Sequence, residues 1–201
     1  MPNKSRKNTF YIAVRPIFTA IFKLLYRPTI IGKEYIPTEG AYVLAGNHIH
    51  ALDPILVDVC TKRIVRTLAK SELFDGAFGW FFRKANCISV DLDAKKNPEA
   101  LQSAIDALNE GYLVNVSPEA ARNLEDTLLP FKPGAVYMSK KTNVKVIPYA
   151  IYGEYKLFKK GLTIKFSKPV SYVENSVEEA NDLLYKTITN LRKELKDKTT
   201  L

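Results

Sequence analysis

Short apolar runs alternate along the chain with longer stretches whose apolar residues recur at helical spacing. The apolar runs, which are typical of buried strands, occupy residues 41–46, 63–68, 87–90, 112–116, 144–151 and 162–166. Helical patterns cover residues 77–85, 97–108, 132–141 and 177–195, and a further helix is expected to begin at Asp53. Strands that alternate with helices are usually joined by crossover connections. The pattern therefore predicts an α/β fold in which helices flank a mixed, largely parallel sheet.

Capping residues mark where three of these helices are expected to begin. Asp53 and Asn97 are each followed by a proline, which is the order expected of an N-cap and a first helical turn. Ser176 and Glu179 have the spacing of a capping box, in which each side chain binds the other residue's backbone amide. This box is expected to start a closing amphipathic helix.

Residues 1–28 form a separate basic and apolar segment. Pro16 predicts the first turn of a helix that runs to Tyr26, with Ile17, Ile21, Leu24 and Leu25 at helical spacing. Charged residues interrupt the apolar run, so it is too short to span a membrane, which needs roughly 20 apolar residues. We predict an amphipathic helix on an anionic membrane surface, with residues 29–201 as the main domain. The alternative is a terminal helix that docks on its own domain.

The charge distribution places much of the basic character in this first segment. The chain has 201 residues, of which 46% are hydrophobic, and a formal net charge of +9. Six cationic residues and no acidic residue precede position 28, namely Lys4, Arg6, Lys7, Arg15, Lys23 and Arg27. Cationic residues beside apolar ones favour contact with anionic lipid. No recognition motif for nucleic acid accompanies the charge, so a nucleic-acid partner is not expected.

Few cysteines and histidines are available for chemistry. Cys60 and Cys87 have no partners at metal-ligand spacing and form no disulfide framework, so we expect a reducing compartment and no metal site. His48 and His50 are the only histidines. Any imidazole chemistry is therefore confined to one short segment.

Two polar loops follow predicted strands. The first carries Asn47, His48, His50 and Asp53, and the second carries Pro118, Glu119 and Arg122. Ligands of open α/β sheets bind beyond the carboxyl ends of the strands, where both loops are expected. A strand-to-helix turn can place the imidazole of His48 against the carboxylate of Asp53, which would leave the other ring nitrogen free to take a proton. A simple N-cap role for Asp53 and a structural role for His48 are the alternatives.

The first loop and several later segments resemble one enzyme family, in the family's own order. Residues 47–53 (NHIHALD) resemble the Asn-His-(four residues)-Asp signature of the 1-acylglycerol-3-phosphate acyltransferase family, which also includes glycerol-3-phosphate acyltransferases. Residues 70–74 and 79–91 are similar to its second block, and residues 116–122 (VSPEAAR) to its third, usually Phe-Pro-Glu-Gly-Thr-Arg. Residues 131–135 (FKPGA) continue the third block, and residues 144–151 resemble the fourth. The resemblance spans residues 30–169.

The resemblance implies a role for each matched residue. His48 would act as general base on an acceptor hydroxyl, and Asp53 would orient it, so that the hydroxyl attacks an acyl thioester without an acyl-enzyme. The implied substrate-binding residues are Asn47, Lys70, Glu119 and Arg122, with Arg122 holding a phosphate through its planar fork of donors. His50 matches no family position and is interpreted as incidental or supporting. The aromatic residues Phe78, Trp80, Phe81 and Phe82 would line an acyl-chain tunnel or form plain core.

The resemblance also implies a reaction and a location. Residues 29–201 would be a catalytic domain that converts 1-acylglycerol-3-phosphate to phosphatidate, in phospholipid biosynthesis. The donor would be an acyl thioester of acyl carrier protein or coenzyme A, and no cofactor or metal is expected. The implied location is the cytoplasmic face of the cell membrane, as a peripheral or monotopic protein that binds anionic lipid.

Three positions depart from the family's pattern and leave alternatives open. Ala120 and Ala121 replace the usual Gly-Thr, and Leu92 stands where the family often has Arg. Candidates for the missing positive charge are Lys70, Arg83, Lys95 and Lys96. Without the resemblance, Glu119 and Arg122 would be interpreted as a surface ion pair. The alternative functions are an acyltransferase for glycerol-3-phosphate or another lysolipid, and a catalytically silent membrane-binding relative.

Overall fold

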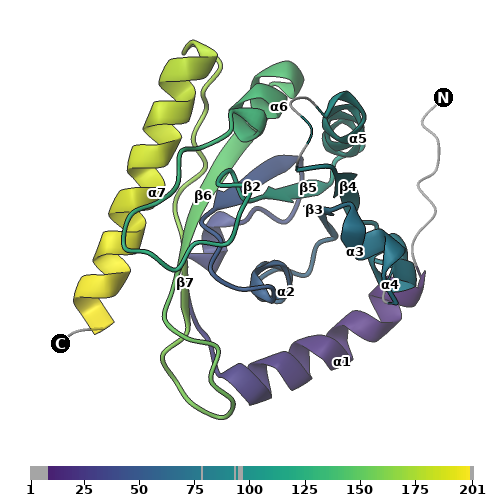
Figure 1. Ribbon diagram of the computed structural model, residues 1–201, viewed down its shortest axis with the longest axis vertical. Helices are drawn as coiled ribbons and strands as arrows, with labels where there is room; N and C mark the ends of the chain where they lie inside the picture. Colours follow the sequence, from purple (N-terminus) through teal and green to yellow (C-terminus); the bar gives the residue numbers. More distant parts are fainter. Residues whose placement is uncertain (1–8, 78, 93, 95–96, 200–201) are drawn as a thin grey trace.

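The strands of the described part of the chain form one seven-stranded sheet (Figure 1). The computed structural model describes residues 9–77, 79–92, 94 and 97–199. Its strands are β1 (Thr29–Ile31), β2 (Tyr42–Gly46), β3 (Val65–Lys70), β4 (Ile88–Val90), β5 (Leu113–Val116), β6 (Lys145–Tyr152) and β7 (Thr163–Phe166). Their order is β1-β7-β6-β2-β5-β3-β4, and each neighbouring pair is parallel except β6 with β7. The predicted mixed, largely parallel sheet is confirmed.

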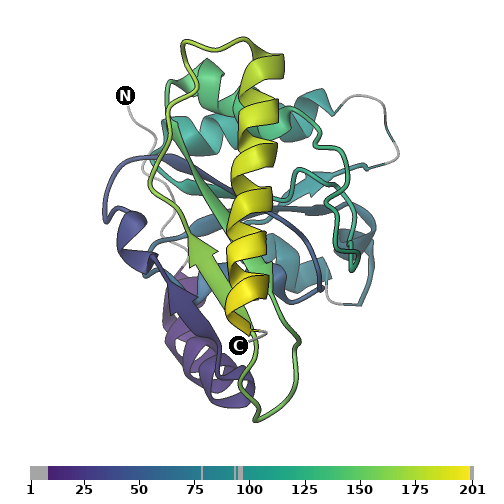
Figure 2. The ribbon, with the colours of Figure 1, turned by 90° about the vertical axis from the view of Figure 1, so that its left-hand side faces the viewer.

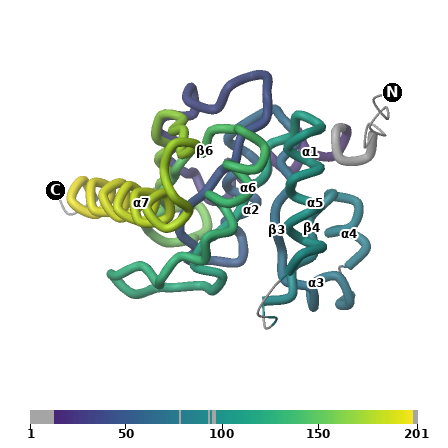
Figure 3. The backbone as a smooth tube through the Cα atoms, turned by 90° about the horizontal axis from the view of Figure 1, so that it is seen from above, coloured from purple at the N-terminus to yellow at the C-terminus, as the bar shows by residue number. Residues whose placement is uncertain are grey.

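Helices cover both faces of this sheet. They are α1 (Thr9–Tyr26), the 3₁₀ helix η1 (Lys33–Tyr35), α2 (Asp53–Asp58), α3 (Glu72–Asp75), α4 (Gly79–Lys84), α5 (Pro98–Asn109), α6 (Gly134–Thr142) and α7 (Val177–Thr199). One hydrophobic core joins the sheet to α5, α6 and α7, and a second joins its other face to α1 and α2 (Figures 1 and 2). Seen from above, α7 lies at one end of the molecule, with α3 and α4 at the other (Figure 3).

The central strand β2 contributes side chains to both cores. Val43 and Ala45 belong to the core under α5–α7, whereas Leu44 belongs to the core on the opposite face. All three are fully buried, because successive side chains of a strand point to opposite faces and both faces are covered here. The continuous apolar run in the sequence follows from this double burial.

Sequence patterns located most elements to within two residues. The predicted capping box at the start of α7 is confirmed, since the Ser176 amide donates to Glu179 Oε2 at 2.9 Å and the Glu179 amide donates to Ser176 Oγ at 3.1 Å. The strand β1 and the helix α3 were not predicted. They contain three and four residues, which is too few for a period of hydrophobicity to be recognised.

The first helix is longer than predicted. Helix α1 begins at Thr9, so Pro16 lies inside the helix and not in its first turn. An interior proline removes one main-chain hydrogen bond but does not prevent a helix whose apolar pattern continues on both sides. The cationic residues Lys4, Arg6 and Lys7 lie outside the described residues, and the division of the chain at residue 28 stays a prediction.

One side of α1 docks on the domain, and the other side faces outward. Phe22 is buried in the core beside α2, and Arg15 forms an ion pair of 3.0 Å with Asp58 of α2. The opposite side exposes large apolar side chains, among them Ile17, Ile21 and Leu24. None of the described helices is long and apolar enough to cross a membrane. The structure thus gives α1 an inner docked face and an outer apolar face.

Candidate active site

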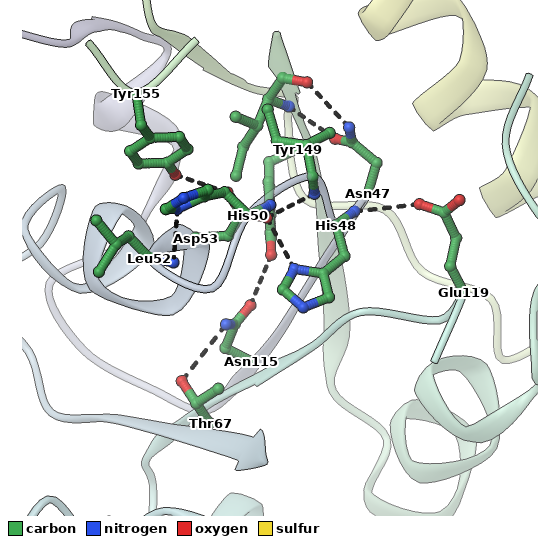
Figure 4. A network of polar contacts seen from close by, with 12 residues as sticks. Asn47, His48, His50, Leu52, Asp53, Thr67, Asn115, Glu119, Tyr149 and Tyr155 are labelled. Carbon is green, nitrogen blue, oxygen red and sulfur yellow. Dashed lines mark hydrogen bonds and ion pairs between the residues drawn. The ribbon is translucent and has the colours of Figure 1, made fainter. Parts of the chain in front are cut away.

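The two polar loops predicted from the sequence meet at one edge of the sheet. Strands β2 and β5 are parallel neighbours, with Ala45 opposite Val116 at their carboxyl ends. His48 follows β2 and Glu119 follows β5, and the backbone amide of His48 donates to Glu119 Oε1 at 3.1 Å. The expected juxtaposition of the two loops is therefore present (Figure 4).

His48 and Asp53 form the central pair of the first loop. The ring nitrogen Nδ1 of His48 lies 2.8 Å from Asp53 Oδ2. The imidazole keeps 22% of its side-chain surface exposed, whereas the carboxylate is almost fully buried. Among the described residues, no protein group hydrogen-bonds to Nε2 of His48, which leaves that nitrogen available to a ligand.

The carboxylate of Asp53 is held by three further donors. Oδ2 accepts the backbone amides of Ile49 at 2.7 Å and His50 at 2.8 Å, and Oδ1 accepts the hydroxyl of Tyr155 at 2.6 Å. Leu52 is the N-cap of α2, and Asp53 is the first residue of the helix. The predicted N-cap role for Asp53 is therefore wrong, because its carboxylate bonds back into the preceding loop and toward His48.

Asn47 and His50 fix the two sides of the same loop. The side-chain amide of Asn47 makes two hydrogen bonds with the backbone of Ile151 on β6, at 2.9 Å and 2.7 Å. The ring of His50 stacks on Tyr155 at 4.4 Å between centroids, and its Nδ1 accepts the Leu52 amide at 3.2 Å. Both side chains thus contact protein atoms, and the substrate contact predicted for Asn47 stays a prediction.

Glu119 is buried and joins the second loop to the first. Besides the His48 amide, its carboxylate accepts the side chain of Asn123 and the backbone amide of Leu129, each at 2.9 Å. The backbone amide of Asn123 donates to the backbone carbonyl of His48 at 2.7 Å. Glu119 does not form the alternative surface ion pair with Arg122, because its described partners are these three donors.

Arg122 lies on the exposed part of the second loop. Its side chain lines a groove together with Ala120 and Ala121, and no described residue forms an ion pair with it. Ala120 adopts a left-handed backbone with φ of 55°, at the position where the resembled family usually has glycine. Glycine adopts this conformation without a steric penalty, whereas alanine does not.

A large groove runs past His48 and is lined by residues of both helix layers. It has a volume of about 1630 Å³ and reaches from α1 and α2, past His48 and β3, to the beginnings of α5 and α6. Its walls are mainly apolar and include Phe18, Phe81 and Phe82, while Phe78 lies outside the described residues. Trp80 is half exposed. The groove has enough volume, and is sufficiently apolar, to receive an aliphatic chain beside the His48 ring.

Basic side chains occur around this groove, and of the residues expected to supply the missing positive charge Lys70 lines it whereas Arg83 does not. Lys70 lines it and forms an ion pair of 2.8 Å with Glu72. Lys132 also lines it, and its Nζ donates to the Leu92 carbonyl at 3.4 Å, beside the position where the family often has Arg. Arg83 lines a different cavity and binds the Phe74 carbonyl. Lys95 and Lys96 lie outside the described residues.

The ionisable groups around the pair are tuned by burial. Burial raises the pKa of Cys60 to about 12 and that of Cys87 to about 11, so neither thiol is ionised near neutral pH. Burial, followed by the negative charge of Asp53, raises the pKa of Tyr155 far above its ordinary value. Its hydroxyl therefore stays protonated and remains a hydrogen-bond donor to Asp53.

Two residues of the site were missed by sequence reasoning. Tyr155 lies 102 residues after Asp53 and has no pattern that connects it to the first loop. Lys132 belongs to the FKPGA segment, whose match to the third block was a signal, but its position next to Leu92 depends on the tertiary fold. Both contacts join segments that are far apart in the sequence, so no local pattern predicts them.

Comparisons with known proteins identify the family of the chain. The Acyltransferase family model matches residues 27–152. The 1-acyl-sn-glycerol-3-phosphate acyltransferase of Bacillus subtilis is 31% identical over 137 residues, which cover 66% of this chain and 67% of the relative. That of Borreliella burgdorferi is 27% identical over 135 residues, which cover 66% of this chain and 54% of the relative. The human alpha enzyme is 28% identical over a match that covers 63% of this chain and 46% of the relative. The chain thus spans about half the length of several relatives that it matches.

A solved structure supports the fold. The crystal structure of the 1-acyl-sn-glycerophosphate acyltransferase PlsC from Thermotoga maritima matches with a TM-score of 0.78 and 24% identity. The match covers 98% of this chain and 84% of that one. Together with the family match over residues 27–152, these similarities show that the chain belongs to the acyltransferase family that includes the 1-acyl-sn-glycerol-3-phosphate acyltransferases.

Proposed function

We propose that the protein transfers a fatty acyl group from an acyl thioester to the free hydroxyl of 1-acylglycerol-3-phosphate and so forms phosphatidate. The observation that carries this proposal is the 2.8 Å contact between His48 and Asp53 beside a large apolar groove. A base with a fixed orientation supplies the proton transfer, and the groove supplies room for an acyl chain.

The geometry supports direct attack by the acceptor hydroxyl. Asp53 binds Nδ1 of His48, so the neutral ring carries its proton there and Nε2 can accept the hydroxyl proton. The hydroxyl oxygen then bonds to the thioester carbon, the carbon–sulfur bond breaks, and the imidazolium returns its proton to the leaving thiolate. Neither cysteine is proposed as a nucleophile, because burial keeps both thiols protonated.

The acceptor phosphate is proposed to bind at the basic rim of the groove. Arg122 offers an exposed guanidinium, and Lys132 places an ammonium group beside Leu92. Lys70 contributes a further positive charge on the same groove. The positive charges of these groups would take the place of the arginine that Leu92 replaces, and would hold the phosphate.

Glu119 and Asn47 are proposed to position the site and not to touch substrate. Glu119 receives the amide of His48, and Asn47 is clamped to β6. Both therefore fix the backbone that carries the general base. This refines their predicted substrate-binding role.

The donor and the location are proposed from the same family resemblance. Acyl carrier protein or coenzyme A would carry the acyl group, and α1 would rest on the cytoplasmic face of the membrane through its outer apolar side. That position would let a lysolipid move from the bilayer to the groove without full transfer through water.

Product analysis tests the proposal. Purified protein would be incubated with lysophosphatidate, glycerol-3-phosphate or lysophosphatidylcholine, and with acyl-coenzyme A or acyl carrier protein thioesters. We expect mass spectrometry to detect phosphatidate, and His48→Ala protein to form none above background. Acylation of glycerol-3-phosphate or of lysophosphatidylcholine alone would replace the proposed acceptor. No product from any pair, with protein that is folded by circular dichroism, would favour the catalytically silent relative.

A further inference from the structure

We propose that the connection between β6 and β7 is a second lipid-contacting element, which joins the outer face of α1 in one surface for an anionic bilayer. The connection, residues 153–162, is here called the β6–β7 loop. It lies at the same end of the molecule as α1 in Figures 1 and 2. The proposal extends the membrane contact proposed for α1, and it does not depend on which acceptor is acylated.

The tip of the loop exposes two large apolar side chains. Leu157 is 55% exposed and Phe158 is 58% exposed. On α1, the residues Ile17, Ile21 and Leu24 are exposed to a similar degree and share one side of the helix. An isolated exposed apolar residue needs no explanation, whereas apolar groups presented by two adjacent elements indicate a binding surface.

Contacts at the base of the loop fix it against α1. The Phe158 amide donates to the carbonyl of Leu25. The ring of Tyr155 lies against Tyr26 at 5.6 Å and against Phe22 at 6.5 Å between centroids, both in edge-to-face arrangements. The loop and the carboxyl end of α1 are therefore one packed unit, and their exposed apolar residues are presented together.

The charges of this unit select an anionic partner. Lys159 and Lys160 follow the apolar tip, and neither has an ion-pair partner among the described residues. Lys23 and Arg27 lie on α1 and just beyond it, exposed to solvent. Lys156 pairs with Glu154, the one acidic residue of the loop. Apolar side chains with flanking cations match the headgroup boundary of an anionic membrane.

The backbone at the tip also points to a role outside the fold itself. Phe158 has φ of 61°, a left-handed conformation that bulky residues rarely adopt. Asparagine or glycine would adopt it at lower cost, and the exposed ring gains little from the domain core. A phenylalanine at this position is explained by a partner that receives the ring.

Vesicle binding tests the loop separately from α1. The double variant Leu157→Asn with Phe158→Asn removes the apolar tip and keeps a residue suited to the left-handed backbone. We expect its affinity for vesicles of phosphatidylcholine mixed with phosphatidylglycerol to fall at least about tenfold in a sedimentation assay, since burial of two large side chains is lost. The matched control is Leu183→Gln on α7, which is also exposed and apolar and should bind as the parent does.

A second pair of variants tests the charges. Lys159→Gln with Lys160→Gln should weaken binding to the anionic vesicles and leave the weak binding to pure phosphatidylcholine unchanged. Lys145→Gln with Lys186→Gln is the control, because Lys145 begins β6 at the end opposite the loop and Lys186 lies on α7. Added salt should reduce the difference between the two pairs.

Fluorescence keeps the proposal testable if the tip variants fold poorly. A Leu157→Cys variant labelled with an environment-sensitive dye should shift to shorter wavelength on anionic vesicles, and an equally labelled Leu183→Cys variant should not. Unchanged vesicle affinity of the tip variant, with no shift at position 157, would overturn the proposal, even if α1 variants such as Ile17→Asn and Ile21→Asn lose binding. A dimer in solution that the tip variant abolishes would also overturn it, in favour of a second copy of this chain.

Discussion

The loop after β2 and the loop after β5 meet at the same edge of the sheet but differ in how their polar groups are used. In the first loop, Asp53 binds His48, two backbone amides and Tyr155, and His48 keeps Nε2 open. In the second loop, Glu119 is closed off by three donors, while Arg122 is exposed on the groove.

The difference shows that burial separates the roles within each loop. A buried carboxylate with every partner in the protein positions other groups, whereas an accessible nitrogen can meet a ligand. By this criterion we expect the first loop to carry the proton transfer, and the second loop to contribute one positioning carboxylate and one cation that binds substrate.

The largest effect is expected at His48. His48→Ala should lower kcat by about 10²–10⁴-fold, because it removes the base that accepts the hydroxyl proton. Thermal unfolding should change little, since the ring is partly exposed. His50→Ala is the neighbouring control and should retain much more activity. Equal losses in the two variants would contradict a special role for His48.

Glu119 is expected to affect stability more than substrate binding. Glu119→Ala would leave three donors without their acceptor, and we expect the free energy of unfolding to fall by about 2–4 kcal/mol. Glu125→Ala, on an exposed side chain of the same loop, should stay within about 0.5 kcal/mol of the parent. Chemical denaturation measures both. An unchanged stability with a raised KM for lysophosphatidate would instead support the predicted contact with substrate.

Arg122 is expected to act on the acceptor. Arg122→Ala should raise the KM for lysophosphatidate by about 10- to 100-fold, because a charge-assisted contact with the phosphate is lost. The KM of Arg122→Lys should fall between those of the parent and of Arg122→Ala, since lysine keeps the charge and loses the planar fork of donors. Lys186→Ala on α7 controls for net charge. Unchanged lysophosphatidate kinetics in Arg122→Ala, with His48 still essential, would exclude a phosphate contact at this residue.

The smallest effect concerns the backbone of the second loop. Ala120→Gly should raise the free energy of unfolding by about 0.5–1 kcal/mol, because glycine adopts the left-handed φ of 55° without a steric penalty. Ala121→Gly, whose backbone is not left-handed, should give no gain. A decrease in thermal stability of Ala120→Gly, measured by calorimetry, would show that the alanine side chain makes a contact worth more than the strain.

Local patterns were sufficient for the sheet and for the central pair. The apolar runs predicted β2 and β5 because both strands are buried on two faces, and the spacing of His48 and Asp53 predicted their contact because a short turn joins them. The role of Asp53 was partly misjudged, since a residue that precedes a proline can bond either forward into the helix or back into the loop. Only the fold decides between these.

Contacts between distant segments were not accessible to the same reasoning. Nothing in the spacing of Glu119 indicates that the His48 amide is its partner, and nothing near Asp53 indicates Tyr155. The left-handed conformation of Ala120 was likewise invisible, although the glycine that usually stands there in related proteins was a clue. Each of these features depends on how strands far apart in sequence are brought together.

The clamp between Asn47 and Ile151 bears on the order in which the protein folds during synthesis. The two residues are 104 positions apart, and Tyr155 is 102 positions from its partner Asp53. Contacts of such separation form late, because the intervening chain must be ordered first. A nascent chain that ends before β6 contains the whole NHIHALD segment but lacks both contacts. We therefore expect truncations that remove β6 and Tyr155 to abolish activity although His48 and Asp53 remain, and such alleles would resemble active-site mutants.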